Sequence, residues 1–494
     1  MKTEKTMTNP EIRNLEPKTL WNKFADLNAV PRPSKHEERV IGFIKQFGQN
    51  LNLETKVDET GNVIIKKPAT KGMENRKPIV LQSHLDMVHQ KNKDTDFDFN
   101  TQGIDMKIEG DWVKAKGTTL GADNGLGVAT MMAILESDTI PHPDLEALFT
   151  IDEETGMTGA MGLKGGVLKG EILLNLDTEE DDEISVGCAG GVDVTALRDY
   201  EEEAVADNKT AFAITVRGLK GGHSGMEIHL GLANANKIMN RFLLDGFENY
   251  GLQIAKIDGG GLRNAIPRES NATVVVDKVM KEGFLLDAQD LTKIIKREYI
   301  SLEPNLEVII EPVELPEKVM EREVQTGLTK AIQAVYNGVY RMSQDMEDLV
   351  ETSNNLARVS VDQGKLEVRC LTRSAVASSR TDLANTVRSA FELMGCDITL
   401  SGEYPGWQPN LDSPILKVLV SQYEKLNGKE PHVTAGHGGL ECGILGQNYP
   451  KMDMASFGPT IKGAHSPDER ANILSTQKFW DYTLEVLKNI PEKG

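Results

Sequence analysis

Two mostly apolar, strand-like runs that each end in acidic residues constrain the fold of this chain more than any other feature. Leu145 to Ile151 is followed by three acids, which include Glu153 and Glu154, and Glu171 to Leu176 is followed by Asp177. Such runs are typical of strands that are buried on both faces of a sheet. Neighbouring side chains of an extended chain point to opposite sides, so Glu153 and Glu154 are expected to have different roles. Either the strands simply emerge into solvent at these acids, or the acids gather around cations.

The length and composition indicate a protein of two or three domains, because 494 residues exceed one ordinary core. A net charge of −20 argues against nucleic acid or an anionic membrane as a partner. The four cysteines lack paired spacing, the first fifteen residues are polar, and no apolar run reaches the length of a membrane span. We therefore expect a cytoplasmic protein with reduced cysteines and no signal peptide.

Helix and strand patterns alternate at both ends of the chain and enclose a middle part of a different type. Residues 1–190 and 404–494 predict one α/β domain, and residues 191–403 predict an inserted α+β domain. The insertion shows the β-α-β-β-α-β order of a ferredoxin-like unit, followed by a degenerate second copy. The first copy comprises strand 211–217, helix 230–244, strands 252–258 and 271–277, helix 285–298 and strand 305–311; the second comprises helix 323–337, a hairpin around 362–365, helix 381–394 and strand 397–400.

Two further segments place polar side chains at strand ends or tight loops. His84 closes a predicted strand that begins at Pro78, and Asp86 lies two residues further on. Residues two apart share one side of a strand, so Asp86 can accept the second imidazole N–H of His84 and hold its tautomer. Asp123 follows a glycine-rich stretch at the start of a predicted helix. It is either a helix cap or a carboxylate that bridges two cations.

His465 precedes Ser466-Pro-Asp-Glu469, a pattern that predicts a capping box and a helix start. A similar box, Ser34-Lys-His-Glu37, is expected to open a helix that carries Val40 and Ile44. The capping box explains Glu469 structurally and leaves His465 held rigidly before the helix.

Together these residues predict a site with nitrogen and oxygen ligands at the strand ends, where open α/β sheets place their sites. Ligands without sulfur suit zinc, with manganese or cobalt as alternatives. Two divalent cations, three carboxylates and one bridging hydroxide give a neutral centre, and Glu153 remains free to act as the general base. The predicted ligands are His84, Asp123, Glu154, Asp177 and His465.

The same segments resemble those of the aminoacyl-histidine dipeptidases (Xaa-His dipeptidase, peptidase D, carnosinase-like), a branch of the dizinc metallopeptidases that includes the aminoacylases. The matches extend over nearly the whole chain in order. They are Ser83-His-Leu-Asp-Met-Val88, Gly121-Ala-Asp-Asn-Gly125, Asp152-Glu-Glu-Thr-Gly156, Asn175-Leu-Asp177, Gly221-Gly-His-Ser-Gly-Met-Glu-Ile-His229, Leu262-Arg-Asn-Ala-Ile-Pro-Arg268, Gly439-Leu-Glu-Cys-Gly-Ile-Leu445 and Gly463-Ala-His-Ser-Pro-Asp-Glu469.

The resemblance implies a three-layer catalytic domain, a lid of duplicated ferredoxin-like topology, and a co-catalytic pair of zinc ions. His84 and Asp177 would hold one ion. Glu154 and His465 would hold the other, and Asp123 would bridge the two ions. Glu153 would deprotonate the water between the ions and then protonate the leaving amine, while Asp86 would orient His84.

The resemblance also implies roles for residues of the lid and of the C-terminal part. His223 would polarise the scissile carbonyl group, an oxyanion role. Asn264 and Arg373 would hold the C-terminal carboxylate of the substrate. Glu441 would meet its free α-amine, and His437 would lie near the same pocket. The glycine-rich segment 434–439 departs from the pattern expected of the family, so the side-chain preference, including any preference for histidine, stays open.

The sequence therefore predicts a metal-dependent dipeptidase that acts on unblocked dipeptides of the Xaa-His type. An N-acyl amino acid deacylase on the same two-metal core is the alternative, and an acid for a free amine, Glu441, favours the dipeptidase. A metal-binding protein without activity is disfavoured because Glu153 is present. A Mg²⁺ phosphotransferase is disfavoured by the two histidines and the lack of a phosphate-binding loop. A homodimer is left open.

Overall fold

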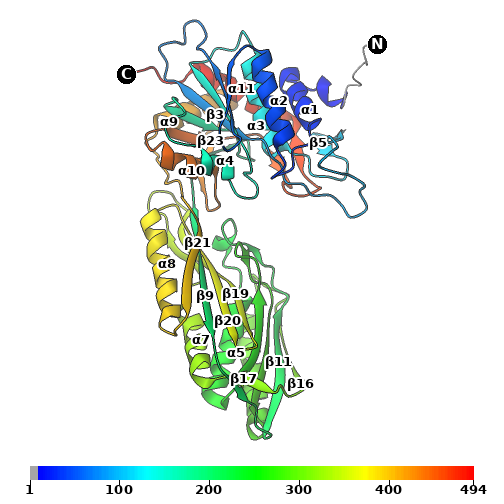
Figure 1. The fold of residues 1–494 in the computed structure, drawn as a ribbon, viewed down its shortest axis with the longest axis vertical. Helices are drawn as coiled ribbons and strands as arrows, with labels where there is room; N and C mark the ends of the chain where they lie inside the picture. Colours follow the sequence, from blue (N-terminus) through cyan, green and yellow to red (C-terminus); the bar gives the residue numbers. More distant parts are fainter. Residues whose placement is uncertain (1–8) are drawn as a thin grey trace. The chain divides into compact units, whose positions relative to one another are not determined.

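The computed structural model describes residues 9–494, so about half of the polar segment 1–15, in which no signal peptide is expected, lies outside it. The chain divides into two compact units (Figure 1). The first unit comprises residues up to Gly187, Pro409–Ala435 and Glu441–Gly494, and the second comprises Cys188–Gln408 and Gly436–Leu440. Among the described helices, none combines the length and the apolar character that a membrane crossing needs.

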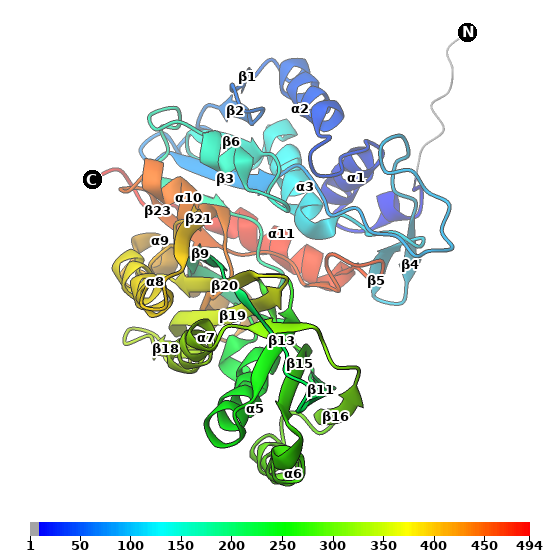
Figure 2. The same cartoon turned by 60° about the horizontal axis from the view of Figure 1, so that its bottom comes forward.

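The first unit is built on an eight-stranded mixed sheet. In β3, β6 and β7 every residue is buried, so both faces of the sheet are covered and the layers number three. Figure 2 shows helices on both sides of these strands; α3 (Ala122–Glu136) packs on β3 and α9 (Pro414–Asn427) on β23. The strand order is β1 (Glu54–Val57), β2 (Val63–Lys67), β6 (Leu145–Thr150), β3 (Ile79–His84), β7 (Ile172–Asn175), β23 (Asp453–Ser456), β8 (Glu183–Cys188) and β22 (His432–Gly436).

The central strands of this sheet bring three chain segments to one edge. β3 pairs in parallel with both β6 and β7, and His84 lies opposite Thr150. Because parallel strands end on the same side, the residues after β6 and β7 emerge beside His84. This edge carries the candidate site.

A separate four-stranded sheet places the segment around His465. Its strand order is β24 (Ile461–Lys462), β25 (Arg470–Asn472), β5 (Trp112–Ala115) and β4 (Met106–Glu109). His465 therefore lies in the loop of a hairpin. The predicted capping box at Ser466 is wrong, because the chain makes turns there and enters β25 instead of a helix. Glu469 is buried and accepts hydrogen bonds from a distant part of the chain, which a short local pattern could not reveal.

The capping box predicted at Ser34–Glu37 is also wrong. The helix that it was expected to open is nevertheless present as α2 (Glu38–Asn50), with Val40 and Ile44 buried. Ser34 Oγ donates to Met87 O instead of capping the helix. Glu37 accepts the backbone N–H of Lys35 through one carboxylate oxygen. Both side chains are thus used to fasten the loop before the helix.

The second unit contains one nine-stranded sheet in which two ferredoxin-like sets meet. The first set runs β11-α5-β13-β15-α6-β16 along the chain and the second runs β9-α7-β19-β20-α8-β21, so the duplicated topology is confirmed. The sets join where β13 pairs with β19 in antiparallel fashion, and β18 (Gly338–Met342) also pairs with β19. In sheet order the strands are β16 (Glu307–Val313), β11 (Lys209–Arg217), β15 (Ser270–Asp277), β13 (Gln253–Gly260), β19 (Val350–Asp362), β20 (Lys365–Ser374), β9 (Gly190–Asp199) and β21 (Asp397–Tyr404).

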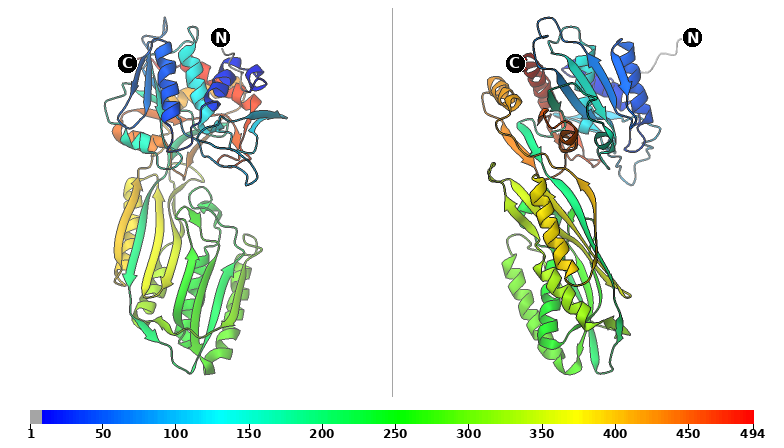
Figure 3. Two further views of the ribbon diagram at one scale, coloured as in Figure 1. Left: turned by 45° about the vertical axis from the view of Figure 1, so that its right-hand side comes forward. Right: turned by 60° about the vertical axis from the view of Figure 1, so that its left-hand side comes forward.

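Helices cover one face of this sheet (Figure 3). The other, more polar face carries charged side chains and one small apolar cluster. The apolar side chains of β9, such as Val192 and Val194, belong to the core beneath the helices, while Asp193 between them is only partly buried. Salt bridges between neighbouring strands, such as Lys256 with Asp362 at 2.8 Å, occupy the polar face. The helices are α5 (Ala235–Tyr250), α6 (Lys281–Glu298), α7 (Arg322–Ala334) and α8 (Ala377–Glu392).

Candidate metal centre

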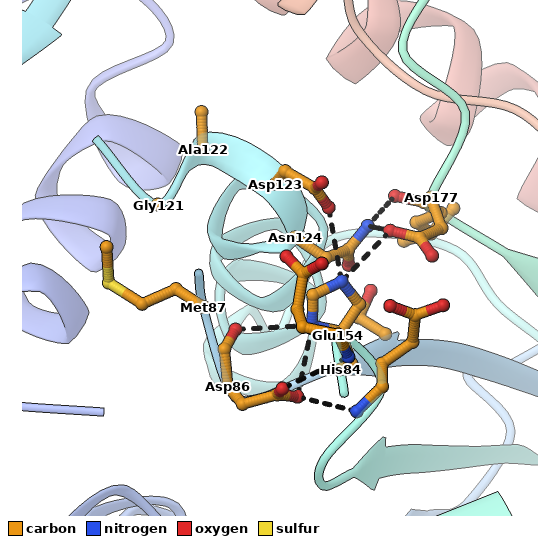
Figure 4. A network of polar contacts seen from close by, with 12 residues as sticks. His84, Asp86, Met87, Gly121, Ala122, Asp123, Asn124, Glu154 and Asp177 are labelled. Carbon is orange, nitrogen blue, oxygen red and sulfur yellow. Dashed lines mark hydrogen bonds and ion pairs between the residues drawn. The ribbon is translucent and has the colours of Figure 1, made fainter. Parts of the chain in front are cut away.

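The five predicted ligands converge at the carboxyl edge of β3, β6 and β7, around Asp123. The two carboxylate oxygens of Asp123 face two different histidines: Oδ1 lies 3.1 Å from His84 Nε2, and Oδ2 lies 3.2 Å from His465 Nε2. Figure 4 shows His84 between Asp123 and Asp177. One carboxylate thus spans two histidine nitrogens.

Each histidine also faces a carboxylate of its own. Asp177 Oδ1 lies 3.4 Å from His84 Nε2, and Glu154 Oε2 lies 3.0 Å from His465 Nε2. The centre is therefore two half-sites, each with one histidine and one acid, which share Asp123. In each half-site the three ligand atoms lie within 4.8 Å of one another.

This donor set fits two divalent cations. Glu154 Oε1 is buried and has no hydrogen-bond partner in the part of the chain that the structure describes, as expected of an oxygen that would face a cation. Imidazole and carboxylate donors with no sulfur suit zinc and similar first-row metals. Asn124 donates to Asp177 and to Leu176 O, which holds the Asp177 carboxylate toward the centre.

The two histidines of the centre have raised pKa values, so in the absence of metal they bind protons at the positions where cations would lie. Burial alone would lower the pKa of His84, but Asp177, Asp123 and Asp86 outweigh it and raise the pKa well above the usual value. Hydrogen bonds to Asp123 and Glu154 raise the pKa of His465 to about 11. Burial raises the pKa of Asp177 to about 6. Without metal, both imidazoles are therefore cationic at neutral pH.

A fully buried carboxylate, Asp86, connects His84 to the loop after β6. Its two oxygens accept the backbone N–H groups of Glu153 and Glu154 at 3.0 and 3.3 Å. Asp86 Oδ1 also lies 3.3 Å from His84 Nδ1, which leaves Nε2 of His84 directed at the centre. Asp152 adopts a left-handed backbone, with φ of 54°, and accepts hydrogen bonds from Thr155 and Thr158, so the turn is held from both sides.

Glu153 and Glu441 are two further acids at this edge. Burial raises the pKa of Glu153 well above its ordinary value, and Asp177, Glu441 and Glu154 add to the effect, while His84 opposes it. Glu441 Oε2 accepts hydrogen bonds from Gln82 and Thr150, but its Oε1 is buried with no partner among residues 9–494. Burial raises the pKa of Glu441 to about 8.

His223 lies in the second unit, and its tautomer follows from its contacts. Its Nδ1 accepts the backbone N–H groups of Gly225 and Met226 at 3.2 and 3.0 Å. The ring proton must then be on Nε2, which is left as a donor. Burial, with a contribution from Arg373, lowers the pKa of His223, so the ring is neutral.

The other predicted substrate residues, except Glu441, also lie in the second unit. Arg373 donates to Tyr404 Oη at 2.6 Å, and its buried Nε has no partner in the described chain. His437 Nε2 lies 2.8 Å from the hydroxyl of Ser353, which is the cross-strand neighbour of Arg373. Asn264 and His223 line one groove of about 840 Å³. The structure thus gathers these residues in one region of the unit.

His437 should make the stability of the protein depend on pH. Burial, then Arg373, lowers its pKa to about 3, whereas an unfolded histidine titrates near 6.5. Between these values the unfolded chain binds one more proton, so the free energy of unfolding falls as the pH is lowered. From pH 6.5 to 5.0 we expect the parent to lose up to about 2 kcal/mol more than His437→Gln in urea titrations of metal-free protein. The exposed His432→Gln variant is the control, and equal losses in the parent and His437→Gln would contradict the prediction.

Some residues of the site have no signal in the sequence. Arg32 stands between two prolines in a loop, and Glu469 matches a helix-capping pattern. Both are buried behind the centre and bind main-chain atoms. Asp152 begins the predicted acidic run 152–154, and only the folded chain shows that its carboxylate accepts hydrogen bonds from Thr155 and Thr158.

Comparisons with known proteins match most of this chain. The model of "Peptidase family M20/M25/M40" matches residues 80–489. The cytosol non-specific dipeptidase of Escherichia coli is 43% identical over 485 residues, which cover 98% of this chain and 100% of that protein. The crystal structure of aminoacylhistidine dipeptidase from Vibrio alginolyticus is 44% identical, with a TM-score of 0.93 and coverage of 98% and 99%. An aminopeptidase from Bacillus cereus, 16% identical with a TM-score of 0.57, covers 96% of this chain and 99% of its own and shares the fold.

The family model matches most of the chain, and the two similar dipeptidases match nearly all of it. The family is one of metal-dependent hydrolases, and the clustered histidines and acids provide candidate metal-binding groups at the expected edge of the sheet. The chain therefore belongs to peptidase family M20/M25/M40.

Proposed function

We propose that this protein is a dipeptidase that uses two metal ions, most readily zinc, to hydrolyse the peptide bond of unblocked dipeptides, including the Xaa-His type. The observation that carries the proposal is the position of Asp123, whose two oxygens face His84 and His465 in separate half-sites. The printed names of the two similar proteins, a non-specific dipeptidase and an aminoacylhistidine dipeptidase, support the substrate class.

The residues of the chain divide the chemistry between them. Two bound cations would supply Lewis acidity and lower the pKa of a water at the centre. Glu153 takes the proton of the attacking water and delivers it to the leaving amine, a role that suits a buried carboxyl group with a raised pKa. Asp86 holds the backbone of Glu153 through this step.

The proposal also assigns residues to substrate recognition. His223 donates its Nε2–H to the carbonyl oxygen as negative charge develops there. Arg373, whose Nε has no partner among residues 9–494, and Asn264 bind the C-terminal carboxylate, and His437 lies beside Arg373. Glu441 accepts the α-ammonium group through Oε1, which has no partner in the described part of the chain. The second unit, residues 191–403 in the sequence prediction, is thereby assigned the role of a lid.

A deacylase of N-acyl amino acids is the second candidate, because it could use the same two-metal core. The buried Glu441, with one oxygen that has no partner among the described residues, favours a substrate with a free amine, since a blocked amine would leave this acid without a partner.

The cytosolic name of the Escherichia coli relative supports a cytoplasmic location. A homodimer remains part of the proposal, to be tested by light scattering.

A paired assay distinguishes the two candidates. Alanyl-histidine and N-acetyl-alanyl-histidine differ only at the amine, so each can be offered to the metal-loaded protein. We expect kcat/KM to be at least about 100-fold higher for the free dipeptide, because a site that pairs a polar group discriminates strongly against analogues that lack it. Equal or faster hydrolysis of the acetylated compound would support the deacylase instead. Alanyl-leucine as a third substrate measures the preference for histidine.

A further inference from the structure

Two buried side chains of opposite charge, Arg32 and Glu469, lie behind the metal centre without contributing a ligand to it. Arg32 is 1% exposed and Glu469 is 2% exposed. Such groups are rarely buried unless their hydrogen-bonding capacity is used. Here most of it is used on main-chain atoms of the loops that carry the ligands.

Glu469 fastens the loop that presents Asp123. Its Oε2 accepts the backbone N–H groups of Leu120 and Gly121 at 2.6 and 2.9 Å, and its Oε1 accepts those of Ala122 and Asp123 at 2.7 and 3.2 Å. Glu469 lies four residues after His465 in the same hairpin loop. One carboxylate therefore joins the His465 segment to the Asp123 segment.

Arg32 fastens the same loop to the end of β3. Its Nη1 donates to the carbonyl oxygens of Leu85 and Asp86, both at 3.0 Å, and its Nη2 donates to Gly121 O and to the Asn28 side chain. The guanidinium group approaches closely because two glycines make room for it. A Cβ at Gly121 would lie 2.5 Å from Nη2, and one at Gly125 would lie 2.6 Å from it.

We propose that Arg32 and Glu469 are positioning residues that set the spacing of the two half-sites before metal binds. Together they tie the segments that carry His84, Asp123 and His465 through main-chain hydrogen bonds, which fix the backbone and so the reach of each ligand. Outer partners of metal ligands typically account for 10- to 100-fold in affinity. This inference rests on the proposed two-metal function and concerns how the ligands are held.

Glu469→Gln tests the proposal with little change in size. Glutamine places an NH₂ group where one oxygen accepted two N–H groups, so two of the four hydrogen bonds are lost. We expect zinc affinity, measured by competition with a chromophoric chelator, to fall 10- to 100-fold. We also expect elemental analysis to find fewer ions per chain than in the parent after both are dialysed against the same low concentration of free zinc.

Glu303→Gln is a matched control. Glu303 is also 2% exposed and accepts backbone N–H groups, of Lys220 and Ala233, but it lies in the second unit. The Glu303→Gln substitution should lower thermal stability and leave zinc affinity unchanged. If Glu469→Gln likewise lowered only the melting temperature, with the affinity and stoichiometry of the parent, its role would be structural and the proposal would be overturned.

Arg32→Lys provides a second variant, because an ammonium group keeps the charge but has three donors in place of the planar fork. The zinc affinity of Arg32→Lys should also fall 10- to 100-fold.

Hydrogen exchange of the parent protein is a test that needs no variant. The amides of residues 120–123 should stay protected after metal removal, and rapid exchange there would refute the claim that these loops are ordered before metal binds. Failure of the proposed function gives a different result, since the parent itself would then bind fewer than two ions or leave dipeptides intact.

Discussion

Replacing Glu153 by glutamine is expected to lower kcat for dipeptide hydrolysis by about 10³-fold while the bound metal stays unchanged. Glutamine keeps the size of the side chain but cannot accept the proton of the attacking water, and general acid–base catalysis is typically worth 10²- to 10⁴-fold. The backbone N–H of residue 153 still bonds to Asp86, so the loop should keep its shape. Steady-state kinetics and elemental analysis of the same preparation check both parts of the prediction.

Glu171→Gln is the control for this variant. Glu171 precedes β7, and its exposed side chain pairs with Lys77 at 3.5 Å. The control should keep both activity and metal. Activity close to that of the parent in Glu153→Gln would remove Glu153 from the role of base. Loss of metal would indicate instead that Glu153 is a ligand, since one of its oxygens also lies near ligand atoms of His84 and Glu154.

Removing the metal ions with a chelator is expected to abolish hydrolysis and to destabilise the protein, and added zinc should restore both. A ligand that binds only the folded state at 1,000 times its Kd adds about 4 kcal/mol to the free energy of unfolding. Urea titrations with and without zinc measure this difference. Activity that survives complete removal, shown by elemental analysis, would contradict the two-metal proposal.

Metal loading at pH 7 should also release about two protons per chain. Both histidines carry raised pKa values, that of His465 reaching about 11, and each must lose its proton to become a ligand. Metal binding competes with protons for these groups, so the apparent metal affinity rises with pH. Near pH 6 Asp177 adds to this dependence because its pKa is about 6. Calorimetry in two buffers of different ionisation enthalpy counts the protons, and a count of zero would refute this description.

The parts of the fold and site that the sequence predicted are those with strong local patterns. β3, β6 and β7 are rich in apolar residues because both faces of the sheet are buried, and parallel pairing then brings their ends together. The positions of His84, Glu154 and Asp177 follow from that geometry. The sequence predicts a helix from residue 230, whereas α5 begins at Ala235, because Asn234 caps it through the N–H groups of Asn236 and Lys237 and residues 228–230 form a short 3₁₀ turn.

What the sequence could not show depends on partners far away along the chain. β9 is the first strand of the second ferredoxin-like set, yet its neighbours β20 and β21 come after the whole first set has been completed. Glu469 has the local pattern of a cap, but its acceptor oxygens are used by residues 120–123. Arg32 is isolated among prolines, and only the folded chain shows that it joins two loops.

The antiparallel pairing of β13 with β19 has an evolutionary consequence. When two identical chains form a dimer by pairing along one strand, each mutation changes both sides of the interface at once. Here the two sides are encoded separately, so either can change its loops, charges or length without a matching change in the other. Selection can therefore specialise one half around His223 and the other around Arg373.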